Sequence, residues 1–246
     1  MNKWFENEDF WISTYPFMFS EAKLSSATEE MDKMLNLVEL QGKDVLDLCC
    51  GPGRCSLALA KKGYNVVGVD STNYLLSKAI SKSKEKNMDI NFIHEDMRNF
   101  KKEESFDLIL NMFTSFGYFE NKNEDILVLE NIYKSLKPGG TLFFDVMGKE
   151  ILAKIYTDTR STKLQDGSLV IQRPRLIDSW TKVHNEWTII KDDVAQTFVF
   201  EHTIYSAQEL IDRMSNVGFK NIKTFGSLDG IPYDPYAVRL IITAQK

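Results

Sequence analysis

The stretch from Val45 to Arg54, VLDLCCGPGR, joins an apolar run to a glycine-containing turn and then to a helix-forming segment. Such a turn lets backbone N–H groups and the amino end of the helix face a bound ligand. Glycine suits positions Gly51 and Gly53, because a Cβ would push the ligand away or forbid the required φ angles. Tight strand-to-helix turns also arise for purely structural reasons, so this stretch alone does not decide the chemistry.

Two acidic residues follow further apolar runs. Asp70 closes the run at residues 65–69, where it can accept hydrogen bonds from both hydroxyls of an adenosine ribose or cap the next helix. Asp96 lies just beyond the run at residues 91–94, where it can accept from an adenine amino group or remain a solvated carboxylate. If these runs are parallel strands, both acids share one carboxyl edge with the turn, and open α/β sheets bind ligands at that edge.

The elements that must position these residues are visible between residues 43 and 246, where short apolar runs alternate with helical periodicity. We therefore expect an α/β fold with a doubly wound, mostly parallel sheet of seven strands. The predicted strands are residues 44–49, 65–70, 91–94, 106–111, 141–146, about 221–225 and about 238–243. Three helices have end signals, namely 57–62 before Gly63, 124–136 before KPGG, and one from the capping box at 206–209 to Gly218.

Two segments fall outside this alternation. Residues 1–40 are rich in aromatic residues and then helical, which predicts an amino-terminal cap. Residues 150–205 alternate apolar and polar side chains, as antiparallel strands with one wet face do, which predicts a small inserted β lid. We expect a single domain in which residues 41–149 form the cofactor-binding core and residues 206–246 a final helix and strand pair.

Composition narrows the class of protein. The formal net charge of −5 argues against a surface built to neutralise phosphates, so nucleic acid is not the expected partner. No signal peptide or membrane span is visible. Cys49, Cys50 and Cys55 lie too close together for a disulfide framework and lack a nearby histidine for zinc. We therefore expect no metal and a cytoplasmic protein with reduced thiols.

Motif comparison separates the possible cofactors. A dinucleotide fingerprint would need glycine where Cys49 and Arg54 stand, and no GK[ST] follows the turn. DLCCGPG, GVD at 68–70, EDM at 95–97 and LKPGG at 136–140 instead resemble the class I S-adenosylmethionine-dependent methyltransferase family, over residues 43 to 148. Cys49 departs from that family, because it replaces the first glycine of the usual three-glycine turn.

This resemblance implies S-adenosyl-L-methionine as the methyl donor, S-adenosyl-L-homocysteine as the product, and an antiparallel last strand in a Rossmann-like sheet. By the same resemblance, the turn from Asp47 to Gly53 surrounds the methionine part, Asp70 holds the ribose, and Asp96 with Met97 brackets the adenine. Asn111 would approach the reacting methyl group. The complete set of implied cofactor contacts is Tyr15, Asp47, Cys49, Gly51, Gly53, Asp70, Ser71, Asp96, Met97 and Asn111.

The acceptor side is read from residues 111–119, NMFTSFGYF, which lack the [DN]PP[YF] motif of many nucleic-acid and protein amide N-methyltransferases. This stretch resembles small-molecule methyltransferases, so we expect transfer to an N or O atom of a small molecule by a monomer or homodimer. The lid should cover the carboxyl edge and exclude water through Trp180, Trp187 and Phe198. The candidate substrate contacts are Phe116, Tyr118, Arg173 and Trp187.

Methyl transfer to an amine free of its proton needs positioning more than a dedicated catalytic residue. For a hydroxyl acceptor a base would help, and the candidates are His202 and His184, each of which can also be a structural hydrogen-bonding group on a lid strand. Two other functions stay open: a cofactor-binding protein without transfer activity, and a methyltransferase that acts on tRNA or protein.

Overall fold

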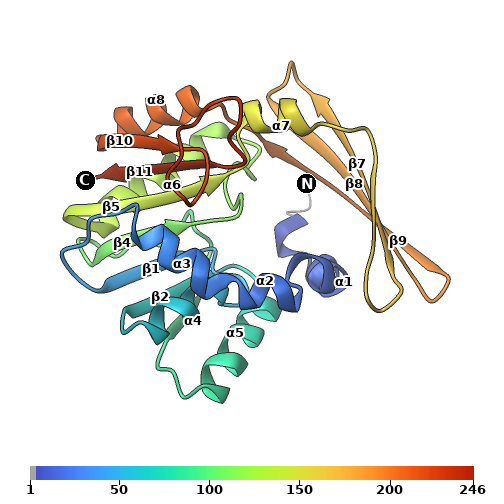
Figure 1. The fold of residues 1–246 in the computed structure, drawn as a ribbon, viewed down its shortest axis with the longest axis horizontal. Coiled ribbons are helices and arrows are strands. Elements are labelled where there is room, and N and C mark those ends of the chain that lie inside the picture. The colour runs from blue at the N-terminus through green and yellow to red at the C-terminus, as the bar shows by residue number, and fades with distance from the viewer. Residues whose placement is uncertain (1–3) are drawn as a thin grey trace.

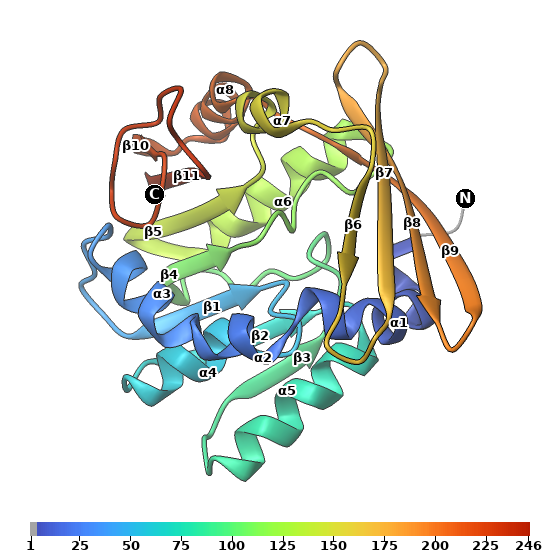
Figure 2. The same cartoon turned by 45° about the vertical axis from the view of Figure 1, so that its right-hand side comes forward.

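The computed structural model describes residues 4–246 and contains two β-sheets (Figures 1 and 2). The strands are β1 (Asp44–Leu48), β2 (Asn65–Asp70), β3 (Asn91–His94), β4 (Phe106–Asn111), β5 (Leu136–Val146), β6 (Arg160–Lys163), β7 (Leu169–Ile177), β8 (Lys182–Lys191), β9 (Val194–Thr203), β10 (Lys220–Phe225) and β11 (Leu240–Gln245). The helices are η1 (Trp4–Glu6), α1 (Glu8–Met18), α2 (Glu21–Ser25), α3 (Ala27–Leu35), α4 (Arg54–Lys61), α5 (Asn73–Glu85), α6 (Lys122–Ser135), α7 (Lys149–Ile155) and α8 (Ala207–Val217). No helix within residues 4–246 is long and apolar enough to cross a membrane.

The larger sheet has the strand order β10-β11-β5-β4-β1-β2-β3. Strands β1 to β5 are parallel, and β11 pairs antiparallel with β5 and β10, which confirms the predicted seven-stranded, mostly parallel sheet. β5 begins at Leu136, earlier than the predicted start at Thr141, because Leu136 already pairs with Phe106 before the register shifts. The antiparallel direction of β11 brings its first residue to the carboxyl edge of the parallel strands.

Alternate residues of the central strands face two apolar layers, because successive side chains of a strand point to opposite faces. Val45 belongs to the layer that contains Met31 of α3 and Leu59 of α4. Its neighbour Leu46 belongs to the opposite layer, together with Met214 of α8. Both faces of the sheet are thus covered by helices, which leaves the carboxyl edge as the place for a site.

The smaller sheet, of order β6-β7-β8-β9, is fully antiparallel and forms the predicted lid beside the carboxyl edge, with α1 next to it (Figure 2). Aromatic contacts join the two: the ring of Phe10 lies 5.4 Å, centroid to centroid, from the rings of both Phe198 and Phe200. The predicted role of Trp180 in excluding water is wrong. Trp180 lies between β7 and β8 and is 47% exposed, because it belongs to the turn at the end of the hairpin.

Candidate active site

A cavity of about 610 Å³ lies at the carboxyl edge of the larger sheet, a volume within the range of small-molecule sites. Its walls come from the β1–α4 turn, the ends of β2, β3, β4 and β5, the amino-terminal helices, and Trp187 of the lid. The predicted cofactor contacts that line it are Asp47, Cys49, Gly51, Asp70, Ser71, Asp96 and Met97. Parallel strand topology therefore brings together most of the residues that the motifs single out.

The turn after β1 uses left-handed backbone at three positions: φ is 64° at Cys49, 54° at Gly51 and 76° at Gly53. A Cβ on Gly53 would also lie 2.9 Å from the Cβ of Ala79, so both packing and φ require glycine there. Gly53 does not line the cavity but lets α5 approach the turn. Cys49 adopts the same left-handed region at a cost of about 1–2 kcal/mol, so the departure from the three-glycine pattern carries backbone strain.

Asp70, at the end of β2, is bonded to the turn rather than to the next helix. Its Oδ2 accepts a hydrogen bond from the backbone N–H of Gly51 at 2.8 Å, and its Oδ1 accepts from the N–H of Thr72 at 2.9 Å. Thr72, not Asp70, is the N-cap residue of α5. Burial raises the pKa of Asp70, while the two backbone N–H groups oppose that rise. Asp70 also lines the cavity.

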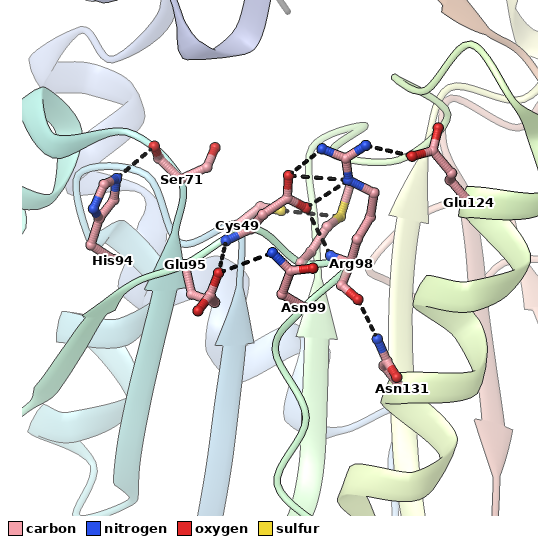
Figure 3. A network of polar contacts seen from close by, with 10 residues as sticks. Cys49, Ser71, His94, Glu95, Arg98, Asn99, Glu124 and Asn131 are labelled. Atoms are coloured by element: carbon pink, nitrogen blue, oxygen red, sulfur yellow. Dashed lines mark hydrogen bonds and ion pairs between the residues drawn. The ribbon is translucent and has the colours of Figure 1, made fainter.

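Asp96, after β3, forms an ion pair with Arg98. Figure 3 shows Arg98, which also pairs with Glu124. The Arg98 Nη2 donates to Asp96 Oδ2 at 2.6 Å, and Nε donates to Oδ1 at 3.0 Å. On its other side, Arg98 Nη1 donates to Oε1 of Glu124 at 2.5 Å, and the guanidinium lies 4.4 Å from the ring of Phe119. The hydrogen bonds to Asp96 raise the pKa of Arg98, so the guanidinium stays charged and fixes the carboxylate at the cavity wall.

The floor of the cavity combines a buried acid with sulfur atoms. Burial raises the pKa of Asp47 to about 6, and its Oδ2 accepts from the hydroxyl of Ser56 at 2.6 Å. The Sγ of Cys49 lies 3.5 Å from the Sδ of Met97, which joins the β1 turn to the loop after β3. Burial keeps the pKa of the Cys49 thiol well above its usual value, so it remains protonated.

Besides Gly53, the predicted cofactor contacts Asn111 and Tyr15 lie away from the cavity, and so does the predicted substrate contact Phe116. Asn111 is fully buried under it and donates to the carbonyl of Leu48 at 3.3 Å. Tyr15 points to α5, where its hydroxyl accepts from Lys82 Nζ at 3.2 Å. Phe116 is 2% exposed and packs inside the sheet core. None of these three belongs to the cavity lining, so their predicted contacts would need a rearrangement.

The remaining candidate residues on the lid strands lie on one face of the lid sheet or the other, because successive side chains of a strand point to opposite faces. Trp187 lies on the inner face and lines the cavity, as does Tyr118 from the loop after β4. His184 lies on the opposite, outer face of β8, where its Nδ1 is 2.9 Å from Oε1 of Glu201 on β9. It does not line the cavity. Arg173 likewise pairs with Glu186, at 2.9 Å, on the outer face.

His202 is on the inner face but belongs to a second cavity of about 490 Å³. Its ring lies 5.5 Å from that of Tyr118, which lines both cavities. Burial lowers the pKa of His202 to about 4, so the imidazole is neutral at neutral pH. A neutral imidazole can accept a proton, but it is separated from the larger cavity by the Tyr118 ring.

Sequence reasoning missed a group of charged residues in the wall of the larger cavity. Glu30 from α3, Arg54 at the start of α4 and Arg239 just before β11 all line the wall, together with Lys23 from α2. Arg54 Nη2 donates to Glu30 Oε1 at 2.6 Å. The only signal in the sequence was the position of Arg54 beside the turn, since nothing local links Arg239 to it.

Comparison with known proteins agrees with this geometry. Residues 45–140 match a family model described as a methyltransferase domain. The chain is 28% identical to the putative methyltransferase YqeM of Bacillus subtilis, over 82% of this chain and 83% of that protein. It is 34% identical to a ubiquinone biosynthesis O-methyltransferase of Coxiella burnetii, over 49% of this chain and 50% of that enzyme.

Among solved structures, an S-adenosylmethionine-dependent methyltransferase from Clostridium acetobutylicum superposes with a TM-score of 0.81 at 17% identity, covering 97% of this chain and 98% of that one. This likeness extends the shared fold beyond the matched motif region to the lid and the carboxyl-terminal strands. With the family model, the relatives and a carboxyl-edge cavity lined by the motif residues, the chain is a class I S-adenosylmethionine-dependent methyltransferase that uses this cofactor as methyl donor.

Proposed function

We propose that the chain methylates an N or O atom of a small molecule bound in the larger cavity, between the cofactor and the lid. The observation that carries this proposal is that one cavity of about 610 Å³ has two kinds of lining residue. It is lined by the residues expected to hold the cofactor, and also by aromatic side chains of the amino-terminal helices and the lid, among them Trp11 and Trp187. A space of that size under a lid suits a small acceptor better than a folded macromolecule.

The residues at the edge fit the cofactor part by part. Asp70 has acceptor oxygens for the ribose hydroxyls, and Asp96 and Met97 flank the place for the adenine. The turn at Gly51, whose N–H is bonded to Asp70, borders the place for the methionine part. The cofactor supplies a methyl group on a positively charged sulfonium. Asp47, Asp70 and Asp96 contribute negative potential that suits this positive charge.

The protein's own task is alignment and exclusion of water. Trp11, Trp187 and Tyr118 present apolar surface to the acceptor side of the cavity. An amine acceptor then needs only to arrive without its proton. For a hydroxyl acceptor, the neutral imidazole of His202, whose ring lies 5.5 Å from that of Tyr118, is a candidate base. Its pKa of about 4 makes it a weak one, and it would serve only an acceptor that extends past the Tyr118 ring.

The comparison with relatives supports a small acceptor but does not identify it. The Coxiella burnetii relative is an O-methyltransferase of ubiquinone biosynthesis. The formal net charge of −5 also disfavours tRNA as the acceptor.

The test is incubation of the purified protein with isotopically labelled S-adenosylmethionine and fractionated cell extract. We expect label in the small-molecule fraction, and roughly ten- to a hundredfold less label at subsaturating S-adenosylmethionine when an Asp70→Ala variant replaces the protein. Label found only in tRNA or protein would contradict the proposal. Binding of S-adenosylhomocysteine with no transfer to any fraction would favour a cofactor-binding protein without activity.

A further inference from the structure

The charged end of the larger cavity contains a guanidinium with unused donors. Arg239 has a side chain that is 28% exposed and lines the cavity, and within residues 4–246 it makes no hydrogen bond through its guanidinium. Its nearest carboxylates, on Asp145 and Glu30, lie at 3.7 and 3.8 Å, beyond hydrogen-bond distance. A partly buried guanidinium with free donors is a site for a planar anion.

A second arginine lies behind the first. The side chain of Arg54 is 10% exposed, and its Nε is buried without a hydrogen-bond partner. Phe113 joins the two arginines, because its ring centroid lies 4.2 Å from the Arg54 guanidinium and 5.4 Å from that of Arg239. Phe113 and Thr114 are held at φ of 59° and 62°, a strained backbone for residues other than glycine. The loop after β4 is thus shaped to place this ring between the two cations.

Cations and carboxylates are matched in number here. Lys23, Arg54 and Arg239 contribute three positive charges, and Glu30, the buried Asp145 and Asp47 contribute three carboxylates. Burial and the charge of Arg54 lower the pKa of Lys23. Because this region has no surplus of positive charge, a monoanion such as a carboxylate fits it better than a phosphate dianion.

Sheet topology separates Arg239 from the residues proposed to hold the adenosine. These residues, Asp70 and Asp96, follow β2 and β3 at one end of the strand order. Arg239 precedes β11, which is separated from β1 by β4 and β5, or roughly 14 Å at ordinary strand spacing. The aromatic wall formed by Trp11 and Trp187 lines the same space.

Resting on the proposed function, we infer that Arg239, supported by Arg54 and Phe113, binds a carboxylate of the acceptor, and that the acceptor is therefore an apolar or aromatic carboxylic acid bearing the N or O atom to be methylated. Arg239 would engage the carboxylate through its planar fork. Arg54, already bonded to Glu30, would add positive potential from the other side of the Phe113 ring. The aromatic wall would cover the apolar part of the acceptor.

The test uses full-length protein saturated with S-adenosylhomocysteine and titrated with a panel of aryl and alkyl carboxylates, led by 4-phenylbutyrate, each paired with its neutral amide. Tryptophan fluorescence reports binding, since Trp11 and Trp187 line the cavity. We expect at least one acid to bind roughly tenfold or more tightly than its amide, and Arg239→Gln to abolish this preference. The matched control is Arg213→Gln, because Arg213 also stacks on a ring, that of Tyr205 at 4.8 Å, but lies outside the cavity.

Three results would overturn the inference. The first is equal affinity of every acid and its amide for the unmodified protein, and the second is tighter binding of phenyl phosphate than of any carboxylate. The third concerns the cofactor, whose methionine part also carries a carboxylate. If Arg239→Gln weakens S-adenosylhomocysteine but not 5′-methylthioadenosine, which lacks that carboxylate, the subsite serves the cofactor. Thermal unfolding and 5′-methylthioadenosine binding show whether each variant is folded.

Failure of the proposed function would look different from failure of the subsite. If the acid preference depends on Arg239 but no small molecule accepts label from S-adenosylmethionine, the transfer proposal is wrong and the subsite stands. If labelled small molecules are found and none carries a carboxylate, the subsite inference is wrong and the transfer proposal stands.

Discussion

The carboxylate of Asp70 accepts a hydrogen bond of 2.8 Å from the backbone N–H of Gly51, so the end of β2 is tied directly to the turn that follows β1. This bond joins two motifs that are distant in the sequence, and it brings the acid proposed to bind the ribose to the turn proposed to hold the methionine part. It also means that Asp70 has a structural role beside its proposed ligand role. The two roles can be separated by substitution.

Asp70→Ala should weaken S-adenosylhomocysteine binding by roughly one to two decades, because acceptors for two ribose hydroxyls are lost. It should also lower the free energy of unfolding by about 1–3 kcal/mol, since the N–H groups of Gly51 and Thr72 lose their partner. Calorimetry and urea unfolding measure the two effects. Asp89→Ala, an exposed aspartate before β3, is the matched control. An unchanged dissociation constant would leave Asp70 with its structural role alone.

Arg98→Met should release the carboxylate of Asp96 and weaken binding of S-adenosylhomocysteine and 5′-methylthioadenosine equally, by about tenfold, since both ligands carry the adenine. Glu124→Gln should have a smaller effect, because Arg98 keeps both bonds to Asp96 in that variant. Isothermal titration of both ligands measures the change. A tighter complex in Arg98→Met would instead mean that Arg98 competes with the adenine for Asp96.

At position 49, glycine and alanine should show the reverse of their usual order of stability. Alanine usually exceeds glycine by about 0.5–1 kcal/mol within regular structure. At Cys49, with φ of 64°, the left-handed backbone costs alanine about 1–2 kcal/mol, so we expect Cys49→Gly to be more stable than Cys49→Ala by about 1 kcal/mol. Urea unfolding of the two variants gives the difference. The opposite order would show that the turn relaxes at no cost.

His202 should make folding sensitive to acid. Its pKa is lowered to about 4 from 6.5, so the native protein binds fewer protons than the unfolded chain between these values, and stability falls as pH falls through this window. The loss attributable to His202 is at most about 3 kcal/mol. Asp47 and Asp125, whose pKa values are raised to about 6, act in the opposite direction, because they favour the native state at low pH.

Comparison with a His202→Gln variant isolates the histidine from these carboxylates. Unfolding in urea at several pH values from 4 to 7 should show a shallower loss of stability toward acid in the variant than in the unmodified protein. Parallel curves would show that His202 is solvated rather than buried in the native state.

The sequence by itself was enough to predict that most of the proposed cofactor-binding residues lie together. Asp70 and Asp96 each end a short apolar run, and the ends of parallel strands must meet at one edge, so identifying the strands was enough to predict that the acids lie together. Gly53 could also be read locally, because a left-handed turn between strand and helix favours glycine wherever the turn occurs. The alternating pattern of residues 150–205 likewise predicted the antiparallel lid.

Only the tertiary structure decided which of the candidate substrate-binding side chains line the cavity. Residues on one strand alternate between faces, and the sequence does not say which face a neighbouring element will cover, so Trp187 reaches the cavity while His184 and Arg173 face outward. Arg54 and Arg239 are brought together by the antiparallel return of β11, a long-range pairing with no local signal. Asn111 illustrates the same limit, since its place at a strand end was read correctly while its side chain points beneath the cavity.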